Sequence, residues 1–241
     1  HQLKNCSLEL GGKNAALIFA DAPKEKLYEH IVRAAFQNTG QICLCGSRLL
    51  VERRYYDEFR DAFVARAKHH LVGDPLAEGT FLGPLVSQAH HDKVMSHLDL
   101  AREEGGRILA GGRRIDVPGR CANGWFVAPT VVEGLGPQCR TNQEEIFGPI
   151  VTLQAFEDEE EALALANATS YGLSASIWTE QLSRAHRLSA RIEAGIVWVN
   201  TWMARDLRTP FGGTRQSGLG REGGLEAMRF FTEPKNVCIG V

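Results

Sequence analysis

The stretch that decides the fold runs from residue 15 to residue 52 and reads AALIFADAPKEKLYEHIVRAAFQNTGQICLCGSRLLVE. It opens with an apolar run at residues 15–19, which predicts a buried strand. Apolar side chains then recur at helical spacing through residues 24–38, and Gly40 marks the end of that helix. A second strand-like run follows at residues 48–52. This order predicts two parallel strands joined by a covering helix.

Strand-like and helical stretches continue to alternate along the rest of the chain. The strand-like runs are residues 150–156, 173–178 and 195–200, and the helical stretches are residues 55–70, 88–104, 158–168 and 181–193. The alternation predicts an α/β fold in which a mostly parallel sheet is covered by helices.

Two stretches near the C-terminus depart from this alternation. Residues 209–224 contain six glycines, so we predict a loop there. Residues 236–241 are predicted to form a final short strand, for which the sequence offers no partner.

The composition is that of an ordinary globular protein, since 44% of the 241 residues are hydrophobic and 23% are charged. The 27 basic and 29 acidic residues give a net charge of −2, so nothing favours a nucleic-acid partner. No apolar run reaches the roughly 18 residues that a membrane-spanning helix needs. We therefore expect neither a nucleic-acid nor a membrane partner.

The six cysteines are interpreted as free thiols rather than disulfides, which favours a reducing compartment and a cytoplasmic location. Only one residue separates Cys43 from Cys45, fewer than zinc-binding pairs usually have. Histidines in polar helical stretches are interpreted as solvated surface residues rather than metal ligands: His69, His70, His90, His91 and His97. The sequence therefore predicts no metal site.

The segment Leu8-Glu9-Leu10-Gly11-Gly12 places a carboxylate among apolar residues beside a glycine pair. Glycines allow another backbone or a ligand to approach closely. Burial among apolar neighbours raises the pKa of a carboxyl group and suits Glu9 to general-base work near neutral pH. A glutamate that caps or pairs locally at a strand end fits this segment equally well.

Cys43 follows the helix that Gly40 ends, in a polar turn that favours exposure over core packing. A thiolate in such a turn can act as a nucleophile, especially where backbone N–H groups face it. A buried structural cysteine is the alternative, and no histidine lies nearby as in cysteine proteases.

Glu9 and Cys43 lie 34 positions apart, and together they match the two active-site signatures of the NAD(P)-dependent aldehyde dehydrogenase superfamily. The chain resembles this family from about Leu8 to its end. Further segments resemble motifs of the same family: Glu144-Glu145-Ile146-Phe147-Gly148-Pro149, Tyr171-Gly172-Leu173, residues 195–200, Pro210-Phe211-Gly212-Gly213, Ser217-Gly218 and Gly220-Arg221-Glu222.

The resemblance implies a role for each of these residues. Cys43 attacks the aldehyde carbon, its backbone N–H contributes to the oxyanion site, and Glu9 activates the water that hydrolyses the resulting thioester. Glu145 holds the nicotinamide ribose, Phe147 lies beside the ring, and Leu10 also contacts the cofactor. A surface role for Glu145 and core packing for Phe147 are the alternatives. The cofactor implied is NAD, with NADP left open.

The resemblance also implies a domain division. Residues 1–225 correspond to the catalytic domain, and residues 226–241 form a tail whose strand joins a neighbouring subunit's sheet in relatives. The cofactor-binding half that precedes Glu9 in this family is absent, so we expect a fragment of an enzyme that is a homodimer or homotetramer. The alternatives are a non-catalytic remnant that acts as an oligomerisation module, and cofactor-independent hydrolysis by Cys43 and Glu9.

The segment Trp202-Met203-Ala204-Arg205-Asp206-Leu207-Arg208 falls where this family lines its substrate entrance. Together with Cys43-Leu44-Cys45, it looks most like the 2-hydroxymuconic and 2-aminomuconic semialdehyde dehydrogenases. An arginine suits a carboxylate, so we hypothesise a carboxylate-bearing semialdehyde anchored by Arg205, with Phe211 at the pocket mouth. The alternatives are an ion-pair cluster of Arg205 with its neighbours and a core role for Phe211.

Overall fold

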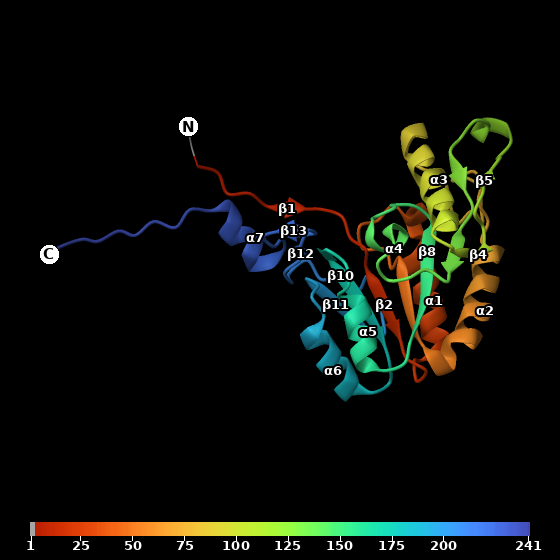
Figure 1. Cartoon of the computed structure of the whole chain (residues 1–241). Helices are drawn as coiled ribbons and strands as arrows, with labels where there is room; N and C mark the ends of the chain where they lie inside the picture. The colour runs from red at the N-terminus through yellow and green to blue at the C-terminus, as the bar shows by residue number, and fades with distance from the viewer. Residues whose placement is uncertain (1–2) are drawn as a thin grey trace.

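The computed structural model describes residues 3–241 and is built around a seven-stranded sheet in the order β11-β10-β2-β3-β8-β7-β4 (Figure 1). Every neighbouring pair is parallel except β4 and β7, which are antiparallel. This confirms the predicted fold class. The strands are β2 (Ala15–Ile18), β3 (Arg48–Glu52), β4 (Arg107–Ala110), β7 (Thr130–Glu133), β8 (Ile150–Phe156), β10 (Ser174–Trp178) and β11 (Ile196–Val199).

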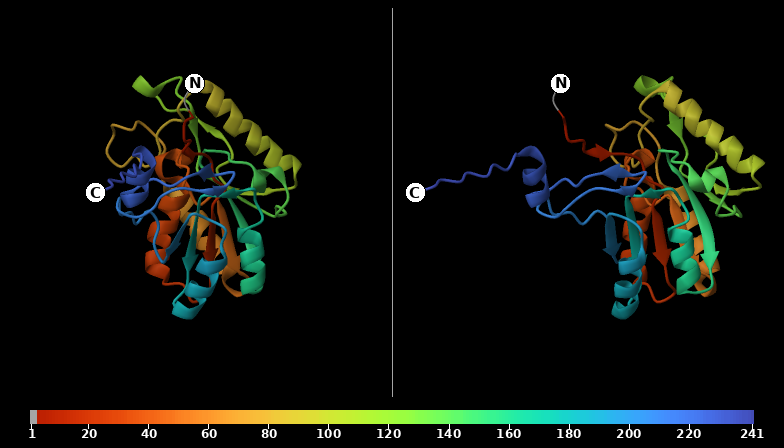
Figure 2. Two further views of the ribbon diagram at one scale, coloured as in Figure 1. Left: turned by 90° about the vertical axis from the view of Figure 1, so that its left-hand side faces the viewer. Right: turned by 60° about the vertical axis from the view of Figure 1, so that its left-hand side comes forward.

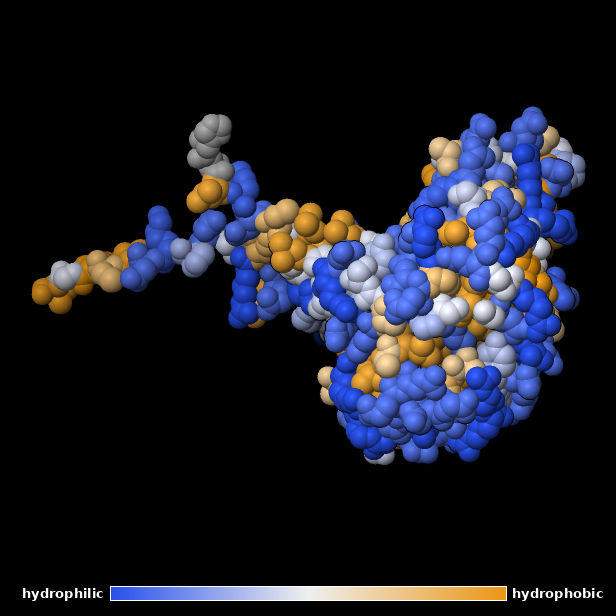
Figure 3. Space-filling view, in the orientation of Figure 1, coloured by the Kyte–Doolittle hydropathy of each residue, from blue (hydrophilic) through white to orange (hydrophobic). Residues whose placement is uncertain are grey.

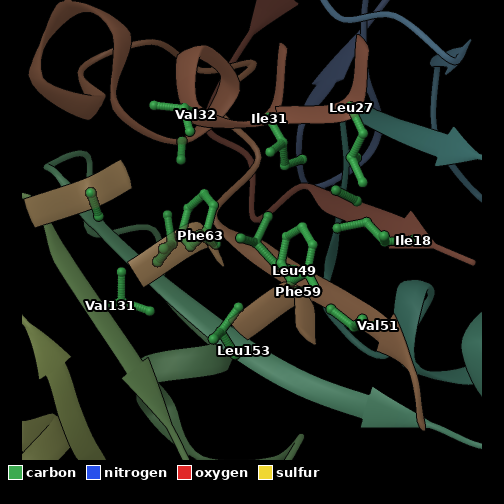
Figure 4. Packing of buried hydrophobic residues seen from close by; sticks show 14 of the residues in the cluster. Ile18, Leu27, Ile31, Val32, Leu49, Val51, Phe59, Phe63, Val131 and Leu153 are labelled. Atoms are coloured by element: carbon green, nitrogen blue, oxygen red, sulfur yellow. The ribbon is translucent and has the colours of Figure 1, made fainter. Parts of the chain in front are cut away.

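Helices cover both faces of this sheet, as Figure 2 shows. On one face, α1 (Lys24–Phe36) and α2 (Arg53–His69) bury their apolar stripes against alternate strand residues, including the cluster drawn in Figure 4. On the other face lie α5 (Glu159–Ala166) and α6 (Leu182–Arg191), which pack against the remaining strand residues. Because alternate residues of a strand point to opposite faces, this two-sided burial requires the nearly continuous apolar runs seen in the sequence.

A third apolar cluster lies under α3 (Gln88–Glu103), which packs against the start of β8. Around it lie the short elements η1 (Gln37–Gly40), η2 (Gly119–Cys121), α4 (Arg140–Gln143) and the hairpin of β5 (Arg114–Ile115) with β6 (Phe126–Val127). Within residues 3–241, no helix is long and apolar enough to cross a bilayer.

The glycine-rich stretch 209–224 is more ordered than predicted, because two short strands form within it. β12 (Thr214–Arg215) pairs with β9 (Tyr171–Gly172), and β13 (Gly218–Leu219) pairs with β1 (Leu8–Glu9). Each pair is held by a segment distant in sequence, which a local glycine count does not reveal.

The helix α7 (Gly224–Phe231) then follows, which the sequence analysis did not predict. The strand predicted at residues 236–241 is wrong for the single chain: this segment has no strand partner and is exposed along its length. A strand needs a neighbouring backbone to accept its hydrogen bonds, and the tail extends away from the body (Figure 1).

Candidate active site

The segments that carry the predicted catalytic residues meet at one edge of the sheet. Glu9 precedes β2, Cys43 precedes β3, and Glu145 and Phe147 precede β8. These three strands are adjacent and parallel, so their amino ends lie at the same edge. The fold therefore brings together residues up to 138 positions apart in the sequence.

The side-chain amide of Asn14 fixes the turn that contains Cys43. Its Nδ2 donates to the Cys43 carbonyl at 2.7 Å and to the Cys45 carbonyl at 2.8 Å. Its Oδ1 accepts the backbone N–H of Ser174 at 3.0 Å. Asn14 is buried and was not among the predicted site residues, although a polar amide directly before a fully apolar strand is a signal for such a role.

The Glu145 side chain packs against the Gly11-Gly12 pair. The backbone N–H of Gly12 donates to Glu145 Oε1 at 2.9 Å, and a Cβ on Gly11 would collide with the same carboxylate. A Cβ on Gly12 would lie 2.8 Å from the Cys43 carbonyl oxygen. Both glycines are therefore required for the close approach of the Glu145 and Cys43 segments.

Glu9 lies in β1, opposite Gly218 of β13, and is half-buried. Burial raises the pKa of its carboxyl group, and the negative charge of Glu222 raises it further, against the opposing charges of Arg221 and Arg205. The raised pKa agrees with the direction predicted from the apolar neighbours. Glu9 Oε2 is buried without a hydrogen-bond partner within the described part of the chain, so it remains able to bind a water or a reacting group.

Cys43 is half-buried rather than freely exposed. Burial raises the pKa of its thiol, followed by the charges of Glu145 and then Glu9, while its own backbone N–H has the opposite effect. The surrounding groups thus favour the neutral thiol, and the proton of Cys43 must be removed before sulfur can attack.

Phe147 is half-buried and has a left-handed backbone, with φ at +61°. Its ring lies edge-on to His90, and its carbonyl oxygen contacts the His90 ring nitrogen. The interpretation of the α3 histidines as solvated is wrong, because His91 and His97 are buried. These histidines are buried because α3 packs against residues 145–150, which are distant in sequence. The polar local sequence of α3 does not predict this contact.

No cluster of three or more His, Cys, Asp or Glu suited to a metal ion is found within residues 3–241. All six cysteines are free. Leu10 donates its backbone N–H to the Ser217 carbonyl at 3.0 Å, and its side chain is exposed beside the site.

Arg205 and Phe211 line one cavity of about 100 Å³, together with Trp198 and Glu222. The Arg205 guanidinium carbon lies 4.5 Å from the centre of the Phe211 ring. Trp202 is buried and donates its indole N–H to the Leu44 carbonyl at 3.0 Å, which gives it a structural role beneath the Cys43 turn.

The ion pair in this segment joins Asp206 to Arg208, and not to Arg205. Within the described residues, Arg205 has no carboxylate partner, although its charge acts on both Glu9 and Cys43. The structure therefore leaves this guanidinium available to an anion at the cavity.

We expect the alkylation rate of Cys43 by iodoacetamide to rise with pH through an inflection above that of free N-acetylcysteine, because only the thiolate reacts. Glu145→Gln removes a nearby negative charge and should move this inflection to lower pH, with peptide mass spectrometry reporting Cys43 alone. Glu144→Gln is the matched control, because Glu144 pairs with Arg140. An inflection that does not move in Glu145→Gln would contradict the conclusion that the charge of Glu145 raises the pKa of Cys43.

The chain is similar to known proteins over nearly its whole length. The model of the aldehyde dehydrogenase family matches residues 1–237. The chain is 50% identical to a 2-aminomuconic 6-semialdehyde dehydrogenase of Pseudomonas sp, over 99% of this chain and 49% of the relative. It is 48% identical to the 2-hydroxymuconic semialdehyde dehydrogenase of Pseudomonas sp. (strain CF600), over 97% of this chain and 48% of the relative.

Solved structures show the same similarity. A putative aldehyde dehydrogenase from Burkholderia cenocepacia superposes with a TM-score of 0.90 at 48% identity, over 94% of this chain and 46% of that chain. Betaine aldehyde dehydrogenase from Staphylococcus aureus in complex with NAD+ gives 0.89 at 38% identity, over 93% and 44%. The chain spans about half the length of the relatives it matches. It belongs to the aldehyde dehydrogenase family.

Proposed function

We propose that this chain is the catalytic half of an enzyme that oxidises an aldehyde to a carboxylic acid with NAD(P). The observation that carries the proposal is the convergence of Cys43, Glu9 and Glu145 at the amino edge of the sheet, where the charges of both carboxylates act on the thiol. In this assignment residues 1–225 form the catalytic domain, and residues 226–241 form the tail.

The chemistry divides between two residues. The Cys43 thiol releases its proton to solvent, its sulfur bonds to the aldehyde carbon, and the carbonyl oxygen that becomes negative faces the backbone N–H of Cys43. Glu145, Phe147 and Leu10 would hold NAD(P), which would supply the hydride acceptor for this oxidation, and the oxidised carbon would remain bonded to Cys43 as a thioester. Glu9 then takes a proton from water, whose oxygen attacks the thioester carbon and releases the acid and the Cys43 sulfur. The raised pKa of Glu9 suits it to this proton transfer.

The residues at the Gly11-Gly12 pair fit a nicotinamide nucleotide. One oxygen of Glu145 accepts the Gly12 N–H, and a carboxylate has further lone pairs for the hydroxyls of a ribose. Phe147 supplies a half-buried ring beside this carboxylate, and Leu10 supplies an exposed apolar surface. NAD is the proposed cofactor, as named for the betaine aldehyde dehydrogenase complex.

A carboxylate-bearing semialdehyde, such as a muconic semialdehyde, is the proposed substrate. The unpaired guanidinium of Arg205 lies in the same cavity as Phe211, and its charge acts on Cys43. The names of the two Pseudomonas relatives point to the same substrate class.

We also propose that the tail mediates a homodimer or homotetramer in the cytoplasm. Large apolar side chains alternate along the exposed end of the tail, as on one face of a strand: Val237, Ile239 and Val241. Among residues 3–241, β11 has a neighbouring strand on one side only, so its other edge offers a matching backbone. Figure 3 shows hydrophobic surface gathered where β1, β13 and α7 leave the body. The free cysteines fit a reducing compartment.

In the full-length protein, Cys43→Ser should abolish NAD-dependent aldehyde oxidation. Glu9→Gln should allow one turnover and then retain the thioester, because water is no longer activated. Intact-protein mass spectrometry would detect the added acyl group on Cys43, and absorbance would detect the initial burst of NADH. Unchanged turnover in Cys43→Ser would exclude the proposed function.

Replacing Arg205 with methionine in the full-length enzyme should lower kcat/KM for a carboxylated semialdehyde about 10- to 100-fold, because a charge-assisted pair is lost. Simple aldehydes of similar size should change far less. Arg208→Met is the matched control, because Arg208 is already paired with Asp206. Equal losses for both substrates would exclude Arg205 as the carboxylate anchor.

In the full-length protein, truncation after Thr232 removes residues 233–241, the exposed end of the tail, and should convert the oligomer to monomers, as measured by size-exclusion chromatography with light scattering. Val237→Asp combined with Ile239→Asp should do the same, because charged side chains oppose strand pairing. Lys235→Ser serves as the control within the tail. An unchanged mass after truncation would rule out the tail as the oligomerisation element.

A further inference from the structure

The first turns of α3 lie directly against the segment that carries Glu145 and Phe147. His90 Nε2 lies 2.7 Å from the Phe147 carbonyl oxygen, and Lys93 Nζ donates to the Glu145 carbonyl at 3.0 Å. His90 and Lys93 are three positions apart, so they occupy the same face of the helix. Two alternate carbonyls of the 145–147 segment are therefore held by one helix face.

The His90 contact has a defined direction. A carbonyl oxygen only accepts hydrogen bonds, so the Nε2 atom of His90 carries the proton. The two rings also meet edge to face, with their centres 6.0 Å apart and an interplanar angle of 67°. His90 thus contacts both the backbone and the ring of Phe147.

Phe147 needs such support because its backbone is strained. Its φ of +61° lies in the left-handed region, which residues other than glycine rarely adopt. The next residue, Gly148, is enclosed: a Cβ on it would lie 2.7 Å from Val94 Cγ2 of α3, and a Cβ on Gly40 would collide with its carbonyl. The strained turn is thus clamped between α3 and the turn that leads to Cys43.

We propose that His90 is a positioning residue that holds Phe147, and with it the nicotinamide-facing side of the site, in its working conformation. This inference rests on the proposed function, since it assigns Phe147 to the cofactor. When the N–H of His90 no longer holds the carbonyl, the strained turn relaxes, and the ring and the Glu145 carboxylate lose their fixed spacing from Gly12 and Cys43.

Two substitutions of His90 distinguish the effect of its N–H donor from the effect of its aromatic ring. His90→Phe keeps an aromatic ring but removes the N–H donor, whereas His90→Gln keeps an N–H donor and removes the ring. His186→Phe is the control, because His186 is exposed on α6. The first measurement is hydrogen–deuterium exchange in the 241-residue chain, with peptides that cover residues 144–149 and, for reference, α2.

We expect exchange over residues 144–149 to accelerate about 5-fold in His90→Phe and to stay near the original rate in His90→Gln, with α2 unchanged in both. In the full-length enzyme, His90→Phe should raise the KM for NAD by about the same factor, while kcat and the aldehyde KM change little.

Exchange rates that are equal in the two variants, or equal to the unsubstituted chain, would overturn the inference. A raised NAD KM of equal size in His90→Gln would overturn it as well, because the donor would then be irrelevant. If the unsubstituted full-length protein does not bind NAD, the proposed function fails instead, and the exchange comparison still decides whether His90 holds the turn.

Discussion

The buried amide of Asn14 joins three segments at the edge of the sheet where the candidate site lies. It donates to two carbonyls of the Cys43 turn and accepts an N–H at the start of β10. All three partner groups belong to the backbone. The amide therefore fixes where the backbone of the Cys43 turn lies, rather than the rotamer of a side chain. Its loss would leave buried backbone groups unpaired, each at a cost of about 1–3 kcal/mol. The position of Cys43 therefore depends on this contact.

The electrostatics of the site follow from that placement. Cys43 is brought between Glu145 and Glu9, whose charges raise its pKa. The guanidinium of Arg205 lowers this pKa, with a smaller effect than either carboxylate. The surroundings of Cys43, the proposed nucleophile, thus favour the neutral thiol.

The sequence predicts this site better than its surroundings. The 150–156 strand follows from its apolar run, a local pattern with a definite consequence in space, whereas the pairing of Glu9 with Cys43 follows from the resemblance to the aldehyde dehydrogenase family. α7 and the pairs β1–β13 and β9–β12 were not predictable in this way, because glycines hide the strands and their partners lie far away in sequence. The burial of His91 and His97 depends likewise on a distant segment. Asn14 was missed because its three contacts exist only after β3 and β10 are in place.

The location of the site at the amino ends of the strands has a further electrostatic consequence. Open α/β sheets usually bind ligands beyond the carboxyl ends of their strands, where helix N-termini supply positive charge. Here α1 ends at Phe36, and the chain continues through η1 to Cys43, so the helix end nearest in sequence to the cysteine is a C-terminus. A helix C-terminus carries partial negative charge and disfavours a thiolate. The Gly46 N–H donates to the Ala34 carbonyl in the last turn of α1 at 3.0 Å, so the turn after Cys43 lies at this C-terminus, whose partial charge has the same sign as Glu145 and Glu9. Of the two carboxylates, Glu145 makes the larger contribution to the raised pKa of Cys43, and the same carboxylate accepts the Gly12 N–H, so the group that disfavours the thiolate is anchored at the Gly11-Gly12 pair.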